Sequence, residues 1–256
     1  MTNQATNLDS WLKLTEDTWQ NPLSFKIDKS KLKHLSIICD GNRRAAKKLN
    51  LNPYFGHRVG IETIKGIART ARLWGIDTLT FWVWSTENWG REKRQVEFVM
   101  NLAEKFLSEK SLLTELQEDK VRFTHIGRKD RLPKALKNIL ESLEENTSEF
   151  KDFRMNLALD YGGEDEIKRA VDRMLQERAK PDAIFDYLDT AGQLFPDLVI
   201  RSGVDAQELI HTSGFMPLQT AYSSWIFLPD LFPNITPGIL LKTIQTFTEY
   251  QRRMGK

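Results

Sequence analysis

Short apolar runs alternate along the chain with longer stretches in which apolar residues recur every three or four positions. Each run is rich in aliphatic, aromatic or β-branched residues and gives way to polar, turn-forming residues, as buried strands do. The runs span residues 35–39, 78–84, 121–126, 154–160 and 197–201. This pattern predicts a strand at each of these places.

The stretches between the runs have the spacing of amphipathic helices. Apolar residues recur at helical spacing over residues 61–73 and stop at Gly75, a residue typical of helix ends. Similar stripes cover residues 98–107, with 112–116 as a continuation, 136–143 after Pro133, and 167–175. Strands that alternate with helices predict an α/β fold with a parallel sheet covered by helices. The length of 256 residues and the even composition indicate a single domain.

Residues 1–33 precede the first predicted strand. Their apolar residues are scattered among polar ones: Leu8, Trp11, Leu12, Leu14 and Trp19. We expect an amphipathic N-terminal helix that packs on its own domain. A helix that anchors the chain at a membrane surface remains the alternative, but the interleaved acids Asp9, Glu16 and Asp17 disfavour it.

Charge and composition narrow the classes of function. The formal net charge is +2 with 28% charged residues, so no overall basic field indicates nucleic acid as a partner. Cys39 is the single cysteine and is expected to be a small buried hydrophobe. No window approaches the roughly 20 apolar residues of a membrane span, and the N-terminus lacks a signal-peptide pattern. We expect a cytoplasmic chain, with peripheral contact to a membrane left open.

The first predicted strand ends in the densest group of chemically active residues. The turn-forming residues Asp40, Gly41 and Asn42 follow it directly, and the bases Arg43, Arg44, Lys47 and Lys48 come next. A carboxylate among bases can hold a divalent cation that bridges to a bound anion, and arginine also binds that anion. The segment predicts a site for a phosphorylated substrate, with a metal at Asp40. A plain turn or helix-cap role for Asp40 remains the alternative.

Other predicted strand ends carry polar or glycine-rich segments, namely residues 85–91, 161–163 and Arg201. Ligands of parallel sheets bind outside the carboxyl ends of the strands, so we expect these segments to face one rim. Ser85 lies outside a G-x-S-x-G turn, which argues against a hydrolase triad. The chain also lacks a GxxxxGK[ST] loop, a GxGxxG segment after the first strand and a DDxxD-like pair, which argues against nucleotide binding and a trinuclear magnesium site.

Several separated motifs share the order and spacing of a known family. They are Asp40-Gly41-Asn42-x-Arg44 with Gly56-His57 and Gly60, Ser85-x-Glu87-Asn88-Trp89-x-Arg91, Tyr161-Gly162-Gly163, residues 197–203, Gln219-x-Ala221-Tyr222, and Arg252-Arg253-Met254-Gly255. Together they resemble the cis-prenyltransferases, the undecaprenyl diphosphate synthase or isoprenyl transferase family. The resemblance implies an N-terminal extension over residues 1–33 and a cis-prenyltransferase-like catalytic domain over residues 34–256.

The resemblance implies a Mg²⁺-dependent transferase that condenses isopentenyl diphosphate with an allylic diphosphate, such as farnesyl diphosphate, to give a cis-prenyl or polyprenyl diphosphate. It further implies a parallel sheet of about six strands, a homodimer, and an apolar tunnel lined in part by Phe81 and Val83. Bulk at Val83 and Trp84 favours a short product. One alternative is a member redirected to a shorter product or an unusual condensation. Another is a non-catalytic or accessory subunit that binds prenyl diphosphate.

The resemblance also implies roles for individual residues. Asp40 would be catalytic and hold the metal, while His57 and Asn88 would assist ionisation or proton removal. Arg201 would bind isopentenyl diphosphate, and Arg253 and Gly255 would reach the substrate of the partner subunit. The substrate-binding set is Gly41, Asn42, Arg43, Arg44, His57, Ser85, Thr86, Glu87, Trp89, Arg91, Arg201, Ser213, Arg253 and Gly255.

The second half of the chain departs from the family's pattern, and the first motif departs at a few positions. The replacements are His211 for an arginine, Gly214 for an asparagine, Ser224 for a glutamate that helps to hold magnesium, Pro53 for an arginine, and Arg43 and Ala45 for a glycine and a tryptophan. Asp205 or Glu208 is a candidate to replace the missing glutamate. We therefore expect the subsites for isopentenyl diphosphate and the metal to be altered.

Overall fold

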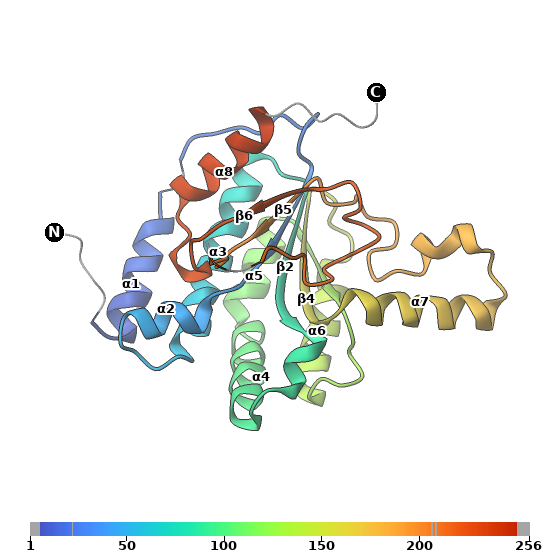
Figure 1. The fold of residues 1–256 in the computed structure, drawn as a ribbon, viewed down its shortest axis with the longest axis horizontal. Coiled ribbons are helices and arrows are strands. Elements are labelled where there is room, and N and C mark those ends of the chain that lie inside the picture. Colours follow the sequence, from blue (N-terminus) through green and yellow to red (C-terminus); the bar gives the residue numbers. More distant parts are fainter. Residues whose placement is uncertain (1–5, 22, 206, 208, 250–256) are drawn as a thin grey trace. The chain divides into compact units, whose positions relative to one another are not determined.

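The computed structural model describes residues 6–21, 23–205, 207 and 209–249. It contains the six-stranded sheet of Figure 1, with the strand order β3-β4-β2-β1-β5-β6. The strands are β1 His34–Ile38, β2 Thr78–Ser85, β3 Val121–Ile126, β4 Phe153–Tyr161, β5 Leu198–Arg201 and β6 Ser224–Phe227. The neighbours β1 and β5, β5 and β6, and β3 and β4 run parallel. The predicted α/β fold with a six-stranded parallel sheet flanked by helices is confirmed.

Helices follow most of the strands. The α-helices are α1 Leu8–Trp19, α2 Asn42–Lys48, α3 Phe55–Trp74, α4 Lys93–Leu107, α5 Lys110–Glu118, α6 Lys134–Thr147, α7 Gly163–Glu177 and α8 Pro237–Glu249. Short 3₁₀ helices are η1 Thr86–Gly90, η2 Pro181–Asp186 and η3 Phe232–Asn234. None of the helices in the described part of the chain is long and apolar enough to cross a membrane.

The chain divides into two compact units. The first comprises residues 1–81, 197–210 and 224–256, and the second comprises residues 82–196 and 211–223. Strand β2 begins in the first unit and ends in the second. In the first unit β1 is buried along its whole length, with Leu35 opposite Leu198 and Ile38 opposite Arg201 on β5. This register brings the carboxyl ends of the two strands together.

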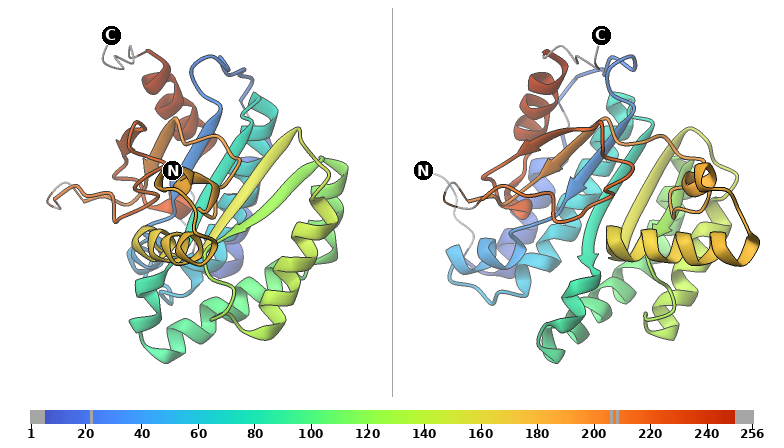
Figure 2. Two further views of the ribbon diagram at one scale, coloured as in Figure 1. Left: turned by 90° about the vertical axis from the view of Figure 1, so that its right-hand side faces the viewer. Right: turned by 45° about the vertical axis from the view of Figure 1, so that its right-hand side comes forward.

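The N-terminal helix α1 packs on α3 within the first unit (Figures 1 and 2). Asn7 begins α1 by accepting a hydrogen bond from the Ser10 backbone N–H at 2.9 Å. The buried face of α1 includes Trp11 and Trp19. Trp19 lies so close to Gly66 of α3 that a Cβ there would stand 2.1 Å from its Cγ. The prediction that this helix packs on its own domain is confirmed.

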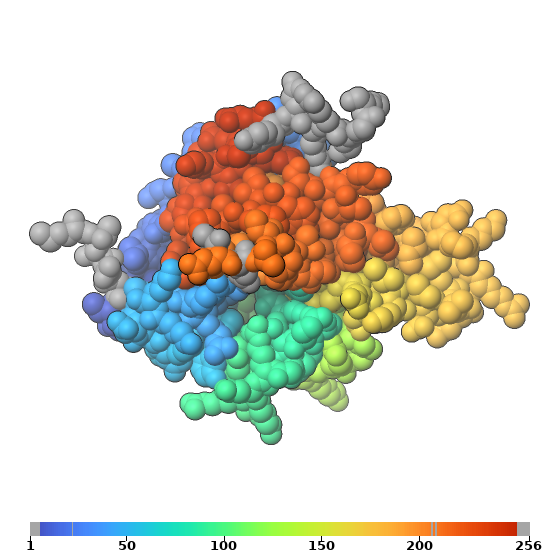
Figure 3. Space-filling view, in the orientation of Figure 1, coloured from blue at the N-terminus to red at the C-terminus, as the bar shows by residue number. Residues whose placement is uncertain are grey.

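In the second unit β3 and β4 pair with Val121 opposite Phe153, and α5 and α6 pack on β3. The stretch predicted as one helix with a continuation is two helices, α4 and α5. The break occurs because Glu109 leaves the helical conformation, with φ −63° and ψ 122°. Figure 3 shows the C-terminal end of α7 and the neighbouring η2 projecting from this unit.

Candidate active site

Asp40 lies at the carboxyl end of β1, next to the end of β5. Arg201 Nη2 lies 3.6 Å from Asp40 Oδ2. Arg44 Nη2, one turn into α2, lies 3.2 Å from Asp40 Oδ1. The structure therefore brings together three of the predicted site residues, although Arg201 is far from the other two in the chain.

The charges around Asp40 do not cancel. Two guanidinium groups face one carboxylate, so the group has a net positive charge and favours a further anion. The Arg201 side chain is only 8% exposed, whereas that of Asp40 is 42% exposed. Asp40 Oδ1 also accepts a hydrogen bond from the Gly41 backbone N–H at 2.5 Å. The partly exposed carboxylate still keeps oxygen lone pairs that a ligand can use. The group can thus hold an anion and a cation side by side.

Ser202 and Gly203 brace the backbone around Asp40. Ser202 Oγ lies 3.1 Å from the Asp40 backbone N, which donates to it, and 3.0 Å from the Asp40 carbonyl oxygen. Gly203 has φ +70°, and a Cβ at this position would stand 2.9 Å from Arg44 Nη2 and 3.0 Å from the Asp40 carbonyl. A larger residue at 203 would therefore push on Arg44 and on the turn. Sequence reasoning missed Ser202, although it lies between two residues of a quoted motif.

Asn42 joins α2 to α3. Its Nδ2 donates to the Cys39 carbonyl at 2.8 Å, which closes the turn after β1. A Cβ on Gly56 would stand 1.9 Å from the Asn42 carbonyl, and one on Gly60 would stand 2.6 Å from Asn42 Oδ1. Glycine at both positions of α3 is therefore required for this close approach. Asn42 Oδ1 is buried and accepts no hydrogen bond from the residues that the structure describes.

The remaining predicted residues of the first unit lie on the same two helices. His57 is partly buried in the first turn of α3, and its backbone N–H donates to the Tyr54 carbonyl at 3.1 Å. It directly follows Gly56, which packs on Asn42. Arg43 is exposed on α2, next to Arg44. The start of α3 is therefore adjacent to α2.

In the second unit the polar segment after β2 forms η1. Ser85 begins this helix, and its Oγ accepts from the Glu87 backbone N–H at 3.2 Å and donates to the Glu87 carboxylate. Thr86 Oγ1 donates to Glu87 Oε1 at 3.0 Å. The Arg91 backbone N–H donates to the Asn88 carbonyl at 3.1 Å. The segment is therefore a compact turn in which the predicted residues bind one another.

Asp160 is the next-to-last residue of β4, directly before Tyr161, and it holds the segment after β2 in place. It is fully buried and has φ +56°. Trp89 Nε1 donates to Asp160 Oδ1 at 2.8 Å, and Arg131 Nε donates to Oδ2 at 2.9 Å while its Nη2 binds Oδ1. The Arg91 guanidinium lies over the Trp84 ring, 5.5 Å from its centroid. Trp89 thus uses its polar atom inside the protein, and a substrate contact for it stays a prediction.

Behind the Tyr161-Gly162-Gly163 segment lies a buried network centred on Glu166. Tyr161 Oη donates to Glu166 Oε2 at 2.7 Å, and Gln219 Nε2 donates to the same oxygen at 3.0 Å. The Asp189 backbone N–H donates to Glu166 Oε1 at 2.8 Å. Burial raises the pKa of Glu166 above its ordinary value, although these donors oppose the shift. Burial and the nearby Glu166 also raise the pKa of Tyr161 well above its ordinary value.

The two glycines of that segment allow close packing. A Cβ on Gly162 would stand 2.3 Å from Thr86 Oγ1, and one on Gly163 would stand 2.2 Å from the Gly214 carbonyl. The ends of β2 and β4 therefore meet within the second unit, as predicted for strand ends at one rim. Sequence reasoning missed Asp160, Glu166 and Asp189. Asp160 and Glu166 lie beside the Tyr161-Gly162-Gly163 motif, which was the available signal for these two, whereas Asp189 adjoins none of the motifs.

The family described as "Putative undecaprenyl diphosphate synthase" matches residues 38–255. This chain belongs to the cis-prenyltransferase family. The curated relatives of this cis-prenyltransferase include the tritrans,polycis-undecaprenyl-diphosphate synthase (geranylgeranyl-diphosphate specific) of Thermococcus kodakarensis, which is 34% identical and aligns over 94% of this chain and 93% of its own length. An isoprenyl transferase of Bacillus cereus is 35% identical over 87% of each chain.

A solved structure supports the same assignment. Lavandulyl diphosphate synthase from Lavandula x intermedia, in complex with dimethylallyl diphosphate, has a TM-score of 0.81 and 30% identity. The match covers 90% of this chain and 100% of that one. This cis-prenyltransferase is accordingly an enzyme that transfers prenyl groups, and these relatives give no support to a non-catalytic subunit.

Three other predicted substrate-binding residues of this cis-prenyltransferase are Ser213, Arg253 and Gly255. Ser213 is exposed, has φ +53°, and its backbone N–H donates to His211 Nδ1 at 3.2 Å. Arg253 and Gly255 lie outside the described residues, so their role stays a prediction.

The structure does not show a second carboxylate beside Asp40 in the described part of this cis-prenyltransferase, either at Ser224, which replaces the family's glutamate, or at the candidate Asp205. Ser224 begins β6 opposite Leu198, three residues before the position level with Arg201. Asp205 is exposed, with Oδ1 accepting from the Gln207 backbone N–H at 3.0 Å, and Glu208 lies outside the described residues. Within the described part of the chain, no group of three or more His, Cys, Asp or Glu side chains is arranged to hold a metal ion.

The apolar tunnel stays a prediction. Phe81 is fully buried in the first unit. In the second unit Val83 is partly exposed and Trp84 is buried. These burial states are compatible with core packing as well as with a tunnel wall.

Proposed function

We propose that this enzyme condenses isopentenyl diphosphate with an allylic diphosphate, with Mg²⁺ as cofactor, to give a cis-prenyl or polyprenyl diphosphate. The single observation that carries the proposal is the Asp40 carboxylate held between Arg44 and Arg201 at adjacent strand ends. Family membership gives the reaction class, and this arrangement gives two cationic side chains for two diphosphates.

The chemistry follows from charge. As the allylic C–O bond stretches, the leaving diphosphate gains negative charge, so cations fixed beside it stabilise the transition state more than the ground state. Arg44 and the exposed Arg43 are assigned to the allylic diphosphate. Arg201 is assigned to isopentenyl diphosphate, because its buried guanidinium is a fixed positive charge.

The residues present fit a magnesium ion shared with substrate. Mg²⁺ binds one or two carboxylates together with substrate phosphates rather than a cage made only by protein. The single, partly exposed Asp40 carboxylate suits this mode. When bound, Mg²⁺ would neutralise charge on the diphosphate that leaves. Asp40 would hold it, and Arg44 and Arg201 would limit the mobility of the carboxylate.

His57 and Asn88 are proposed to act on the reacting carbons and their protons. His57 is assigned to ionisation and Asn88 to orienting the group that loses a proton. Ser85, Thr86 and Glu87 are assigned to contacts with substrate from η1. Their mutual hydrogen bonds fix the turn before substrate arrives, which reduces the ordering needed on binding.

A short-chain product is the second candidate function. Two observations favour it: a lavandulyl diphosphate synthase is structurally similar at a TM-score of 0.81, and the segment after Arg201 departs from the family's pattern. Residues 202–215 contain no strand or helix in their described part. A change confined to that segment would alter the condensation partner or the number of condensations while leaving Asp40 and Arg44 in use.

A homodimer is also proposed. The second unit exposes apolar side chains near the end of α7 and the loop that follows: Val171, Leu175, Phe185, Leu194 and Phe195. Leu175 is 72% exposed, and the Phe185 and Phe195 rings lie 5.2 Å apart. Exposed apolar groups of this kind mark protein interfaces. Light scattering on the wild type and on Leu175→Glu tests the proposal, because a charge at the interface should give a monomer.

The reaction is tested by incorporation of radiolabelled isopentenyl diphosphate. Each of four starters, dimethylallyl, geranyl, farnesyl and geranylgeranyl diphosphate, is supplied with Mg²⁺ or with EDTA, and the product length is then determined. Transfer of label from isopentenyl diphosphate into a longer prenyl diphosphate only with Mg²⁺ supports the proposal. Lack of incorporation with every starter by folded protein contradicts it. A single condensation selects the second candidate over a polyprenyl product.

A further inference from the structure

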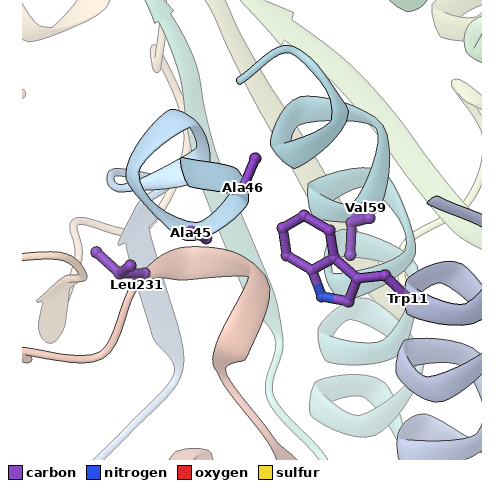
Figure 4. Packing of buried hydrophobic residues seen from close by; sticks show 5 residues of the cluster. All are labelled: Trp11, Ala45, Ala46, Val59 and Leu231. Carbon is purple, nitrogen blue, oxygen red and sulfur yellow. The ribbon is translucent and has the colours of Figure 1, made fainter. Parts of the chain in front are cut away.

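The N-terminal helix supports the helix that carries Arg44. Trp11 of α1 is 4% exposed and belongs to a buried cluster with Ala45 and Ala46 of α2, Val59 of α3, and Leu231. Figure 4 shows the indole of Trp11 between α1, α2 and α3, with Ala46 and Val59 beside it. The two alanines are small, which leaves room for a large ring from another helix. The support for α2 is therefore built by residues outside it.

Such support matters because α2 is short. It has seven residues, whereas isolated helices need about 12–15 residues to be even marginally stable in water. Its first residue follows Gly41, which has φ +96° and no side chain to cap it. Packing on Ala45 and Ala46 must therefore determine how α2 lies. Arg44 is the residue directly before this packed pair, so a tilt of α2 would move its guanidinium relative to Asp40.

The same cluster reaches the Asp40 turn through Leu231. A Cβ on Gly41 would stand 2.7 Å from Leu231 Cδ2, so the turn rests directly on this side chain. The Phe232 backbone N–H donates to the Asp40 carbonyl at 2.9 Å. Trp11, Leu231 and α2 therefore form one packed group that adjoins the turn and the helix bearing the ion pair between Asp40 and Arg44.

The other tryptophan of α1 has a different neighbour. Trp19 is 8% exposed and lies against Gly66 of α3. Gly66 is ten residues beyond Gly56, the glycine that packs on Asn42, which corresponds to about 15 Å along a helix. The two tryptophans are thus alike in size, burial and parent helix. They differ in their neighbours, because Trp11 packs with Ala45 and Ala46 of α2, whereas Trp19 packs on Gly66, farther along α3.

We propose that Trp11 is a positioning residue for the diphosphate site, acting through Ala45 and Ala46 to hold Arg44 and the Asp40 turn. The inference rests on the proposed function, because it assigns this site to an allylic diphosphate. On this proposal, α1 supports the diphosphate site by packing on α2 and is needed for the site's geometry.

The test compares Trp11→Ala with Trp19→Ala in the full chain. Binding of dimethylallyl and farnesyl diphosphate is measured at a temperature where circular dichroism shows both variants folded. We expect Trp11→Ala to weaken binding about tenfold or more, because small displacements of binding groups have large effects. Trp19→Ala should stay within about twofold of the wild type, since it is remote from α2. Trp11→Phe, which keeps an aromatic ring, should recover most of the affinity. If Trp11→Ala does not fold, hydrogen exchange of the α2 amides in Trp11→Phe, described next, is the deciding measurement.

A measurement without ligand separates this inference from the proposed function. Hydrogen exchange of the α2 amides, residues 42–48, should become about tenfold faster in Trp11→Ala or, to a smaller extent, in Trp11→Phe, and should stay unchanged in Trp19→Ala. Equal exchange in α2 for both alanine variants, or equal loss of affinity, would overturn the role of Trp11. If the wild type binds no allylic diphosphate, the proposed function fails, while the exchange data still decide whether Trp11 holds α2.

Discussion

Asp40 in the first unit and Asp160 in the second occupy similar places but have different surroundings. Each lies at the carboxyl end of a parallel strand, and each is paired with arginine. Asp40 is partly exposed, and its arginine contacts are 3.2 and 3.6 Å long. Asp160 is fully buried, with hydrogen bonds from Trp89 at 2.8 Å and Arg131 at 2.9 Å.

The difference separates a carboxylate that can take a ligand from one that cannot. A carboxylate accepts at about four lone-pair positions, and those of Asp160 are directed to donors of its own unit. Asp40 keeps accessible oxygen, and the cations beside it outnumber it. Location at a strand end therefore does not identify a reactive acid. Unused hydrogen-bonding capacity beside excess positive charge does.

The largest expected effect is on activity at Asp40. Asp40→Asn should lower kcat/KM on the order of 10³-fold, about 4 kcal/mol, because it removes the charge placed beside the reacting diphosphate. Steady-state incorporation of isopentenyl diphosphate measures it. Asp160→Asn is the matched control, since it should lower the melting temperature and leave most of the activity per folded molecule. An equal loss of activity in both variants would break the comparison.

The next effect is on stability at Arg131. Arg131→Ala leaves the buried Asp160 carboxylate without its cation, which should lower the free energy of unfolding by about 3 kcal/mol. Urea unfolding measures this change. Arg128→Ala is the control, because its partner Asp165 keeps an ion pair with Arg169 at 2.8 Å. A loss at Arg131 no larger than that at Arg128 would show that Asp160 is not dependent on its arginine.

The hydrophobic pattern predicted five of the six strands, because a strand that is buried on one or both faces contains a run of apolar or alternating residues. Val121 to Ile126 shows it clearly, and β3 has the predicted bounds. β6, Ser224–Phe227, was not predicted although Trp225, Ile226 and Phe227 are apolar, because the run is short and is soon followed by Pro229. The break at Glu109 was missed because the apolar stripe continues through α5 on the same spacing.

The contacts of the site also differ in how far they could be predicted from the sequence. Asp40 and Arg44 are only four residues apart, so their contact is local, with Asp40 before Gly41 and Arg44 in the first turn of α2. The contact of Asp40 with Arg201 requires the pairing of β1 with β5, which no local pattern specifies. Glu166 and Gln219 are also remote in sequence, and their hydrogen bond needs the fold. The strand pattern placed Arg201 at a strand end on the shared rim, and the motif resemblance added a substrate-binding role for it, but neither specified its contact with Asp40.

The third prediction concerns the buried acid Glu166. Tyr161, Gln219 and the Asp189 backbone N–H all donate to Glu166. Glu166→Gln replaces one accepting oxygen by an NH₂ group, so at least one of these donors loses its acceptor. This should lower the free energy of unfolding by about 2 kcal/mol. The effect should depend on pH. Because the folded-state pKa of Glu166 is raised, its contribution is present below its ordinary value of 4.5 and is lost as pH rises through the folded pKa.

Unfolding free energies of wild type and Glu166→Gln between pH 4 and 7 measure this dependence. The wild type should lose stability relative to the variant as pH rises from about 4.5. Glu164→Gln on the same helix is the control, since Glu164 is exposed and pairs with the exposed Lys168 at 3.5 Å. If the wild type instead gains stability relative to Glu166→Gln as pH rises, the pKa of Glu166 is not raised in the folded protein.

The smallest expected effect tests how tightly the Asp40 turn must be held. Ser202→Ala removes the hydroxyl that bonds both the N–H and the carbonyl of Asp40, and should cost about 1 kcal/mol of stability. Ser36→Ala is the matched control, because Ser36 is buried on β1 and its Oγ lies 3.3 Å from His34 Nε2. Both variants should melt at similar temperatures, while only Ser202→Ala should lower kcat/KM, by about fivefold, since it alone loosens the turn that aims Asp40. If kcat/KM falls equally in both, the position of Asp40 depends on the strand as a whole. If it falls in neither, the two arginines and Gly203 suffice to hold the carboxylate.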